Sequence, residues 1–202
     1  MSKRRSTQGK RCLRCQINKI LCFCDQIKEH HTKTIVSIIM HHREKHLTSN
    51  TAKLAPLTLT NSKIYLRGLP KTPFSLEQLP QSKDVLSLYL FPDEDAVVLD
   101  QEFLINHPGP YQLIVPDGTW NQAKKVRRRE PGLSEIKCVK LKEDIVGEYK
   151  LRRGIREDGV CTYEAIAYAL AILENNTVSE DLLRQFRIMN NRVAKSRSAF
   201  DN

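Results

Sequence analysis

The chain has 202 residues, of which 40% are hydrophobic, and carries a formal net charge of +10. This length suits one domain with a small appendage. No apolar run approaches the roughly eighteen residues of a membrane span, and the basic N-terminus lacks the apolar segment of a secretory signal. We therefore expect a cytoplasmic protein with no membrane partner. The positive charge is clustered, which favours a nucleic-acid partner over a merely soluble basic protein.

Four of the six cysteines lie close together near the N-terminus, in the spacing C-x2-C-x6-C-x-C. They are Cys12, Cys15, Cys22 and Cys24. A cytoplasmic protein does not normally keep such residues as disulfides, whereas four thiolates satisfy a structural Zn²⁺ ion. We predict a zinc knuckle over residues 12–30, preceded by a disordered basic tail over residues 1–11. An iron–sulfur cluster and four reduced surface cysteines are the alternatives. Cys138 and Cys161 are expected to be packed side chains rather than ligands.

After the knuckle, short apolar runs alternate with stretches that have helical character. Strands are expected at residues 34–41, 63–68, 85–91, 111–116 and 136–141, and helices at residues 49–59, 93–103, 119–129, 161–174 and 179–199. Pro56 limits or kinks the first helix, and Ser179 is expected to cap the last one. The alternation predicts an α/β domain with a largely parallel sheet over residues 31–202.

Ligands of such sheets bind beyond the carboxyl ends of the strands. Two stretches should therefore face a ligand: LFPDED at residues 90–95 and PDGTW at residues 116–120. In the second, Gly118 permits a close turn, and Thr119 can cap a helix whose N–H groups receive a carboxylate or phosphate. Taken alone, Asp117 reads as a turn acid and Trp120 as a core aromatic residue.

Two basic clusters follow along the chain, the first from Lys124 to Arg129 and the second from Lys150 to Arg156. We expect their members to contact RNA phosphates, and in the first cluster only some of them to face the RNA. The residues assigned to this role are Lys124, Lys125, Arg128, Arg129, Arg152 and Arg153.

In combination, the motifs resemble those of the DTW-domain family. PDGTWNQAKKVRR resembles the family's D-x-T-W signature, and MHHREKHLTSNTAKL resembles its H-x-x-E segment with an asparagine-threonine pair. YLFPDEDAVVL resembles its L-F-P loop, and LRRGIREDGVCTYEAIAYAL resembles its L-S-T-x-E-A block. The resemblance spans about Cys12 to Leu173. The chain departs from the pattern at Ala52, where the family usually has glycine, and at Val160-Cys161, where it tends to have Leu-Ser.

The resemblance implies a SPOUT-like α/β fold, with a mostly parallel sheet, helices on both faces and a C-terminal trefoil knot. It implies a tRNA-uridine aminocarboxypropyltransferase, most similar to bacterial members that carry the cysteine knuckle. Such enzymes move the 3-amino-3-carboxypropyl group of S-adenosylmethionine to N3 of a uridine in the tRNA variable loop and release 5′-methylthioadenosine. The alternatives are a SPOUT-type RNA methyltransferase and a non-catalytic, zinc-containing RNA-binding protein.

Site residues follow from the same resemblance. Asp117 is the candidate general base for the uridine N3 proton, or else a group that orients the cofactor or the uridine. Cofactor contacts are expected from three segments: Leu90, Phe91 and Pro92; Gly118, Thr119 and Trp120; Val160, Cys161 and Thr162. We expect a monomer.

Overall fold

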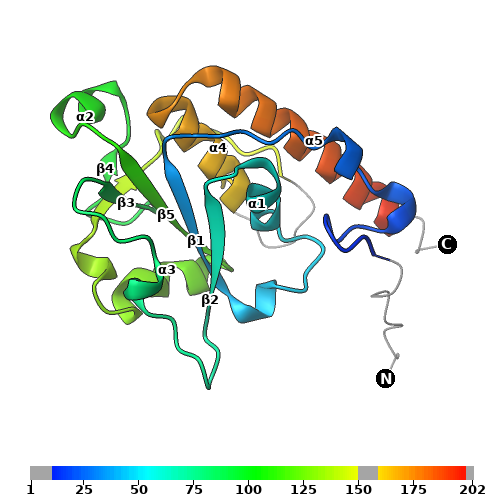
Figure 1. The fold of residues 1–202 in the computed structure, drawn as a ribbon, viewed down its shortest axis with the longest axis horizontal. Coiled ribbons are helices and arrows are strands. Elements are labelled where there is room, and N and C mark those ends of the chain that lie inside the picture. The colour runs from blue at the N-terminus through cyan, green and yellow to red at the C-terminus, as the bar shows by residue number, and fades with distance from the viewer. Residues whose placement is uncertain (1–10, 150–158, 199–202) are drawn as a thin grey trace.

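The computed structural model describes residues 11–149 and 159–198 (Figure 1). Within them, six strands form one sheet in the order β2-β1-β5-β3-β6-β4, and every neighbouring pair is parallel. The strands are β1 (Ile35–His41), β2 (Ser62–Arg67), β3 (Leu86–Leu90), β4 (Val97–Val98), β5 (Tyr111–Asp117) and β6 (Lys137–Lys140). The α-helices are α1 (Ala55–Thr58), α2 (Gln101–Asn106), α3 (Trp120–Arg129), α4 (Thr162–Leu173) and α5 (Asn176–Ser198). The predicted parallel α/β architecture is confirmed.

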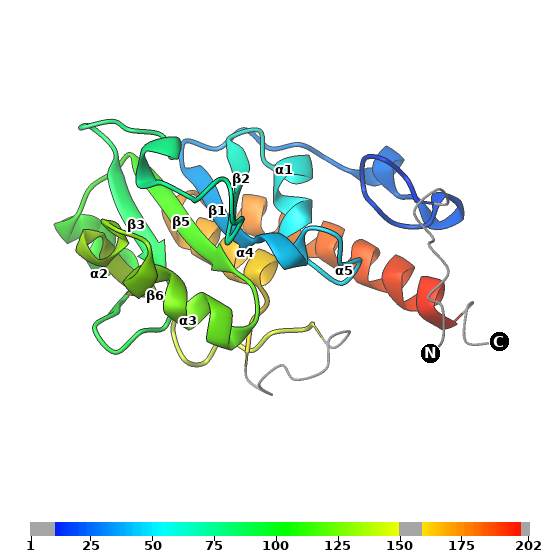
Figure 2. The ribbon, with the colours of Figure 1, turned by 90° about the horizontal axis from the view of Figure 1, so that it is seen from below.

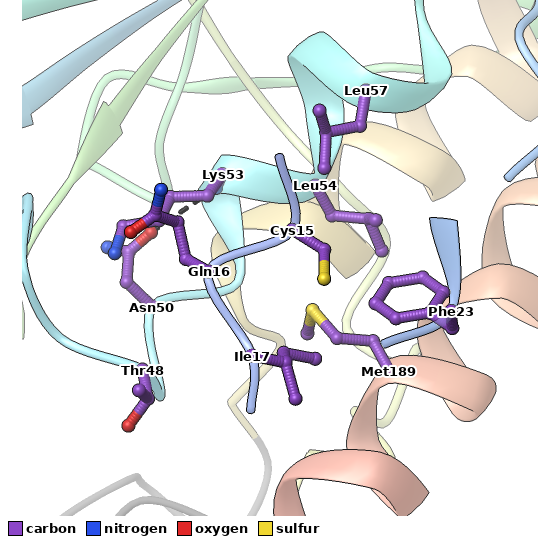
Figure 3. Close-up of a pocket in the computed structure, with 10 residues that line it drawn as sticks. All are labelled: Cys15, Gln16, Ile17, Phe23, Thr48, Asn50, Lys53, Leu54, Leu57 and Met189. Atoms are coloured by element: carbon purple, nitrogen blue, oxygen red, sulfur yellow. Dashed lines mark hydrogen bonds between the residues drawn. The ribbon is translucent and has the colours of Figure 1, made fainter. Parts of the chain in front are cut away.

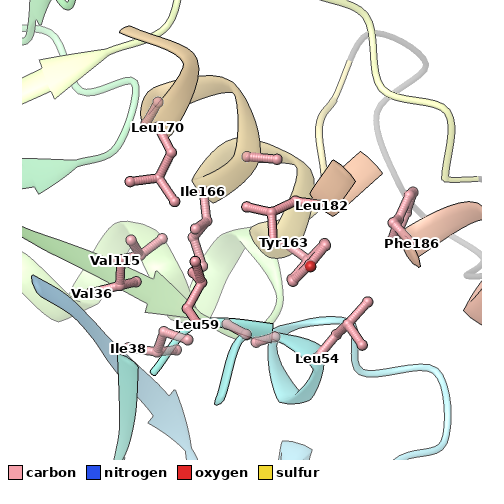
Figure 4. Packing of buried hydrophobic residues seen from close by; sticks show 14 of the residues in the cluster. Val36, Ile38, Leu54, Leu59, Val115, Tyr163, Ile166, Leu170, Leu182 and Phe186 are labelled. Atoms are coloured by element: carbon pink, nitrogen blue, oxygen red, sulfur yellow. The ribbon is translucent and has the colours of Figure 1, made fainter. Parts of the chain in front are cut away.

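Strand β5 lies inside the sheet and is buried along its whole length, because helices cover both faces. Val115 faces the layer formed by α1, α4 and α5, where it packs in one core cluster with Ile166 and Leu170 (Figure 4). Ile114 points to the opposite face and packs in a second cluster with Ala123 and Val126 of α3. The apolar run of β5 is therefore explained by burial on both sides.

Three predicted helices are wrong in their bounds. Residues 49–59 form only the 3-10 helix Ala52–Leu54 and the short α1, with Pro56 in its first turn. Residues 93–103 form no single helix, because Asp100 accepts a hydrogen bond from the Phe103 backbone N–H at 2.9 Å and starts α2 there, after the short strand β4. Helix α5 starts at Asn176, before Ser179, because the Asn175 side chain accepts from the Val178 N–H at 3.0 Å. Ser179 is thus a buried residue within the helix and not its cap.

The cysteine segment lies against α5 in both views of the ribbon (Figure 2). Phe23 is 1% exposed and belongs to the same core cluster as Met189 of α5. The side chain of Gln185, also on α5, accepts from the Lys28 N–H at 2.8 Å and donates to the Lys28 carbonyl at 3.1 Å. The knuckle is thus packed on the helix, and Gln185 bonds both backbone groups of Lys28. Over the described residues, no helix combines the length and the apolar character that crossing a membrane requires.

Candidate active site and metal centre

Asp117 is the last residue of β5 and lies at the carboxyl edge of the sheet. Its side chain is buried, and both of its oxygens accept hydrogen bonds. Oδ2 accepts from Nδ2 of Asn50 at 2.6 Å, and Oδ1 accepts from the Thr162 hydroxyl at 2.7 Å. These two donors come from different segments and fix the orientation of the carboxyl group. The site therefore presents a held carboxylate where three distant segments meet.

The turn after Asp117 is stabilised by a capping box at the start of α3. The Gln122 N–H donates to the Thr119 hydroxyl at 3.3 Å, and the Thr119 N–H donates to Oε1 of Gln122 at 2.8 Å. The predicted cap at Thr119 is confirmed. A Cβ atom on Gly118 would lie 2.8 Å from Oε1 of Gln122, so glycine lets the turn pass close to the box. The Thr119 N–H is engaged here, which limits its use for a cofactor.

A second capping box starts α4. Glu164 is fully buried, and its Oε2 accepts from the Cys161 N–H at 2.9 Å while its Oε1 accepts from the Glu148 N–H. A Cβ atom on Gly147 would lie 2.6 Å from the Gly159 carbonyl oxygen, so this glycine permits the close approach of two segments. Burial raises the pKa of the Cys161 thiol well above its usual value, which keeps it neutral, as expected of a packed cysteine.

The L-F-P loop and the D-G-T-W turn touch through their aromatic rings. Phe91 and Trp120 meet edge to face with ring centroids 5.3 Å apart. The Phe91 N–H donates to the Val139 carbonyl at 3.0 Å, which ties the loop to β6. Leu90 and Phe91 are buried, and Pro92 is exposed. The structure therefore brings together the first two predicted cofactor segments, and the bond between Thr162 and Asp117 brings in the third.

Asn50 and Lys53 belong to this site, although sequence reasoning gave them no role. Burial lowers the pKa of Lys53 to about 8, and its ammonium group donates to the Leu47 carbonyl at 2.8 Å. Both residues line a small pocket, together with Cys15 and Met189 (Figure 3). The asparagine-threonine pair after the H-x-x-E segment was the sequence signal that could have identified Asn50. The knuckle thus lines the same pocket as Asn50, which is a hydrogen-bond partner of Asp117.

The first basic cluster divides into two kinds of side chain. Four residues assigned to RNA are exposed on α3. They are Lys124, Lys125, Arg128 and Arg129. Arg127 instead turns inward, and its side chain is 11% exposed. Arg152 and Arg153 lie outside the described residues, so the second cluster stays a prediction.

The sulfur atoms of Cys12, Cys15, Cys22 and Cys24 all lie within 4.8 Å of one another. The Sγ atoms of Cys12 and Cys24 are 3.7 Å apart, and so are those of Cys15 and Cys22. A tetrahedral zinc with Zn–S bonds of about 2.3 Å separates its sulfur ligands by about 3.8 Å, so the set fits this ion. Hydrogen bonding, chiefly from the Cys15 backbone, lowers the pKa of Cys12 to about 6, whereas burial raises the pKa of Cys15 and of Cys24. In the described part of the chain, this is the one group of three or more His, Cys, Asp or Glu side chains placed to hold a metal ion.

Fold and site together define an α/β protein with a candidate ligand site at the carboxyl edge of a parallel sheet. Residues 9–194 match the sequence profile of the DTW domain, and the chain belongs to this family. The resemblance stated from the motifs is thereby confirmed.

Curated relatives carry a common name. The chain is 32% identical over 186 residues to tRNA-uridine aminocarboxypropyltransferase 2 of Macaca fascicularis, covering 88% of this chain and 61% of that protein. It is 29% identical over 174 residues to the protein of the same name in Drosophila melanogaster, covering 82% and 67%. The chain thus spans 61% of the length of the first relative.

A solved structure shares the fold. The SAM-dependent rRNA:acp-transferase from Vulcanisaeta distributa superposes with a TM-score of 0.52 at 19% identity, covering 83% of this chain and 81% of that one.

Proposed function

We propose that this protein is a tRNA-uridine aminocarboxypropyltransferase. N3 of a uridine attacks the γ-carbon of S-adenosylmethionine, so that an N–C bond forms as the C–S bond breaks. The electron pair of the broken bond stays on sulfur, which turns the sulfonium into the neutral thioether of 5′-methylthioadenosine. The N3 proton leaves to a base. The proposal places the uridine in the variable loop of tRNA.

The observation that carries the proposal is the convergence on Asp117. Asn50, Asp117 and Thr162 belong to three separate segments that resemble DTW-family motifs, and they meet through two short hydrogen bonds at the strand ends. The names of the curated relatives and of the structural neighbour support an aminocarboxypropyl transfer with S-adenosylmethionine as the donor.

In the proposed mechanism, Asp117 accepts the N3 proton, since its carboxyl group lies at the strand end and is oriented there by Asn50 and Thr162. The alternative role for Asp117 is to orient the uridine or the cofactor. The donor lies between Leu90–Pro92, the Gly118–Trp120 turn and the start of α4. Because the Thr119 and Cys161 N–H groups already serve the capping boxes, the proposal relies on other backbone groups and on apolar walls such as Trp120.

The wider proposal covers architecture and partners. Zn²⁺ is the ion for the four cysteines, and it would supply a structural cross-link between the two halves of the knuckle. The SPOUT-type C-terminal knot of the proposal rests on membership of the DTW family. Exposed basic residues of α3 bind tRNA phosphates, and the protein acts as a cytoplasmic monomer.

One assay separates the candidate activities. The protein is incubated with unmodified tRNA and S-adenosylmethionine labelled either in the carboxyl carbon or in the methyl group. Carboxyl label on the RNA supports the proposal, and methyl label would replace it by RNA methylation. Retention of the tRNA without either label would make the protein a non-catalytic RNA-binding protein. Nucleoside mass analysis then identifies the uridine.

A further inference from the structure

Arg127 differs from the basic residues around it on α3. Its Nη1 lies 2.6 Å from Oδ1 of Asp95 and 3.7 Å from Oδ2 of Asp93. Its Nη2 donates to the backbone carbonyls of Ser134 and Ile136, both at 3.3 Å. Three hydrogen-bond acceptors and a second carboxylate thus surround one guanidinium group, which points into the protein. These contacts separate Arg127 from an RNA-facing surface.

Asp93 and Asp95, the acidic partners of Arg127, belong to the acidic end of the L-F-P loop. The apolar end of that loop is fixed separately: the Cys138 thiol donates to the Phe91 carbonyl at 3.3 Å, and the Phe91 ring packs against Trp120. Trp120 begins α3, and Arg127 follows about two turns later on the same helix. One rigid helix therefore contacts the loop at both of its ends.

We propose that Arg127 is a positioning residue for the donor, which sets the L-F-P loop against the D-G-T-W turn through Asp93 and Asp95. This inference rests on the proposed function, because it takes the space beside Phe91 and Trp120 as the place of S-adenosylmethionine. Composition alone would assign Arg127 to the RNA. The geometry assigns it to the cofactor loop instead.

The shape of the guanidinium group is the physical reason. Exposed ion pairs contribute little, and the Asp95 side chain is 61% exposed. Arg127, in contrast, is 11% exposed, and its planar guanidinium group donates to one carboxylate and two backbone carbonyls at once. Such a fork fixes an orientation, so its loss should move the loop more than it destabilises the fold.

The test compares Arg127→Gln with Asp95→Asn, which removes the negative charge of the exposed partner and leaves α3 unchanged. Calorimetric titration with S-adenosylmethionine and filter binding of tRNA are measured separately. We expect each variant to weaken S-adenosylmethionine binding by about tenfold, from the loss of a charge-assisted hydrogen bond, and to leave tRNA affinity unchanged. The double variant should bind S-adenosylmethionine as well as the weaker-binding single variant does, because both substitutions disrupt the same interaction.

Arg184→Gln is the matched control, since Arg184 forms an exposed ion pair with Asp181 on α5. It should change neither affinity. Unchanged S-adenosylmethionine binding in Asp95→Asn and Arg127→Gln would overturn the inference. A second result would also overturn it: Arg127→Gln weakens tRNA binding, and adding Asp95→Asn restores that binding. Arg127 would then act by neutralising acidic charge that repels the RNA phosphates. A wild-type protein that binds no S-adenosylmethionine would instead defeat the proposed function itself.

Discussion

The hydroxyl of Thr162 donates to Oδ1 of Asp117 across 2.7 Å, which joins the first residue of α4 to the last residue of β5. The two residues are 45 positions apart in the chain. Asn50 holds the other oxygen from a third segment, so the carboxylate links both flanks of the strand end. The orientation of Asp117 is therefore fixed by the surrounding fold.

Asp117→Asn should abolish most of the transfer. Asparagine has the same size, but only its amide oxygen accepts hydrogen bonds, so it cannot take the N3 proton. Its amide nitrogen, itself a donor, would also face one of the two groups that donate to Asp117. We expect the rate to fall by about 10²- to 10⁴-fold, measured as carboxyl label transferred to tRNA in single turnover. Asp84→Asn, in an exposed loop, is the matched control and should keep the wild-type rate. Near-normal transfer in Asp117→Asn would exclude the base role.

Thr162→Val and Thr162→Ser separate the hydroxyl from the shape of the side chain. Valine removes the donor to Asp117, whereas serine keeps it. We expect kcat to fall about tenfold in the valine variant, from the loss of one hydrogen bond to a charged group, and serine to restore it. Steady-state kinetics with both substrates check this. Equal losses in the two variants would show that the methyl group, and not the hydroxyl, matters at this position.

Removal of the proposed zinc should loosen the segment that carries Asn50. Cys15 and Ile17 line the same cavity as Asn50 and Lys53, and Arg11 donates to the His46 carbonyl at 3.3 Å. After chelation we expect faster backbone hydrogen exchange in residues 46–54 as well as in the knuckle, read by mass spectrometry alongside zinc content. Readdition of zinc should reverse it. Faster exchange confined to residues 11–24 would argue against this coupling.

Lys53 should make the stability depend on pH. Burial lowers its folded-state pKa to about 8 from the ordinary 10.5. Between these values the unfolded chain binds more protons than the folded one, so the free energy of unfolding should rise with pH. In thermal unfolding, the melting temperature of wild type should therefore rise relative to that of Lys53→Met from about pH 8 to about pH 10. A difference that stays constant over this range would contradict the lowered pKa.

The exposed side chains of α3 should govern tRNA affinity. Lys124→Gln and Arg128→Gln each remove one cation from the exposed face. Each should weaken tRNA binding uniformly and reduce the slope of log affinity against log salt by about one. Filter binding over a series of salt concentrations measures this, and S-adenosylmethionine titration should show no change. An unchanged salt slope would remove these two residues from the RNA surface.

The sequence by itself determined the alternating order of elements, the parallel sheet, the four-cysteine spacing and the cap at Thr119. These depend on local signals, such as β-branched runs, capping side chains and metal-ligand spacing, that act within a few residues. It misplaced the start of α5, because Asn175 and Ser179 are both plausible caps and packing chose between them.

Only the tertiary structure decided which polar groups meet. The bonds of Asp117 to Asn50 and Thr162, and the inward turn of Arg127 toward Asp95, join residues far apart in the chain. On the sequence, Arg127 is one more cation in a basic run. A hydrogen bond needs its partners within about 3 Å in a set direction, and that placement comes from the packed sheet and helices rather than from any local pattern.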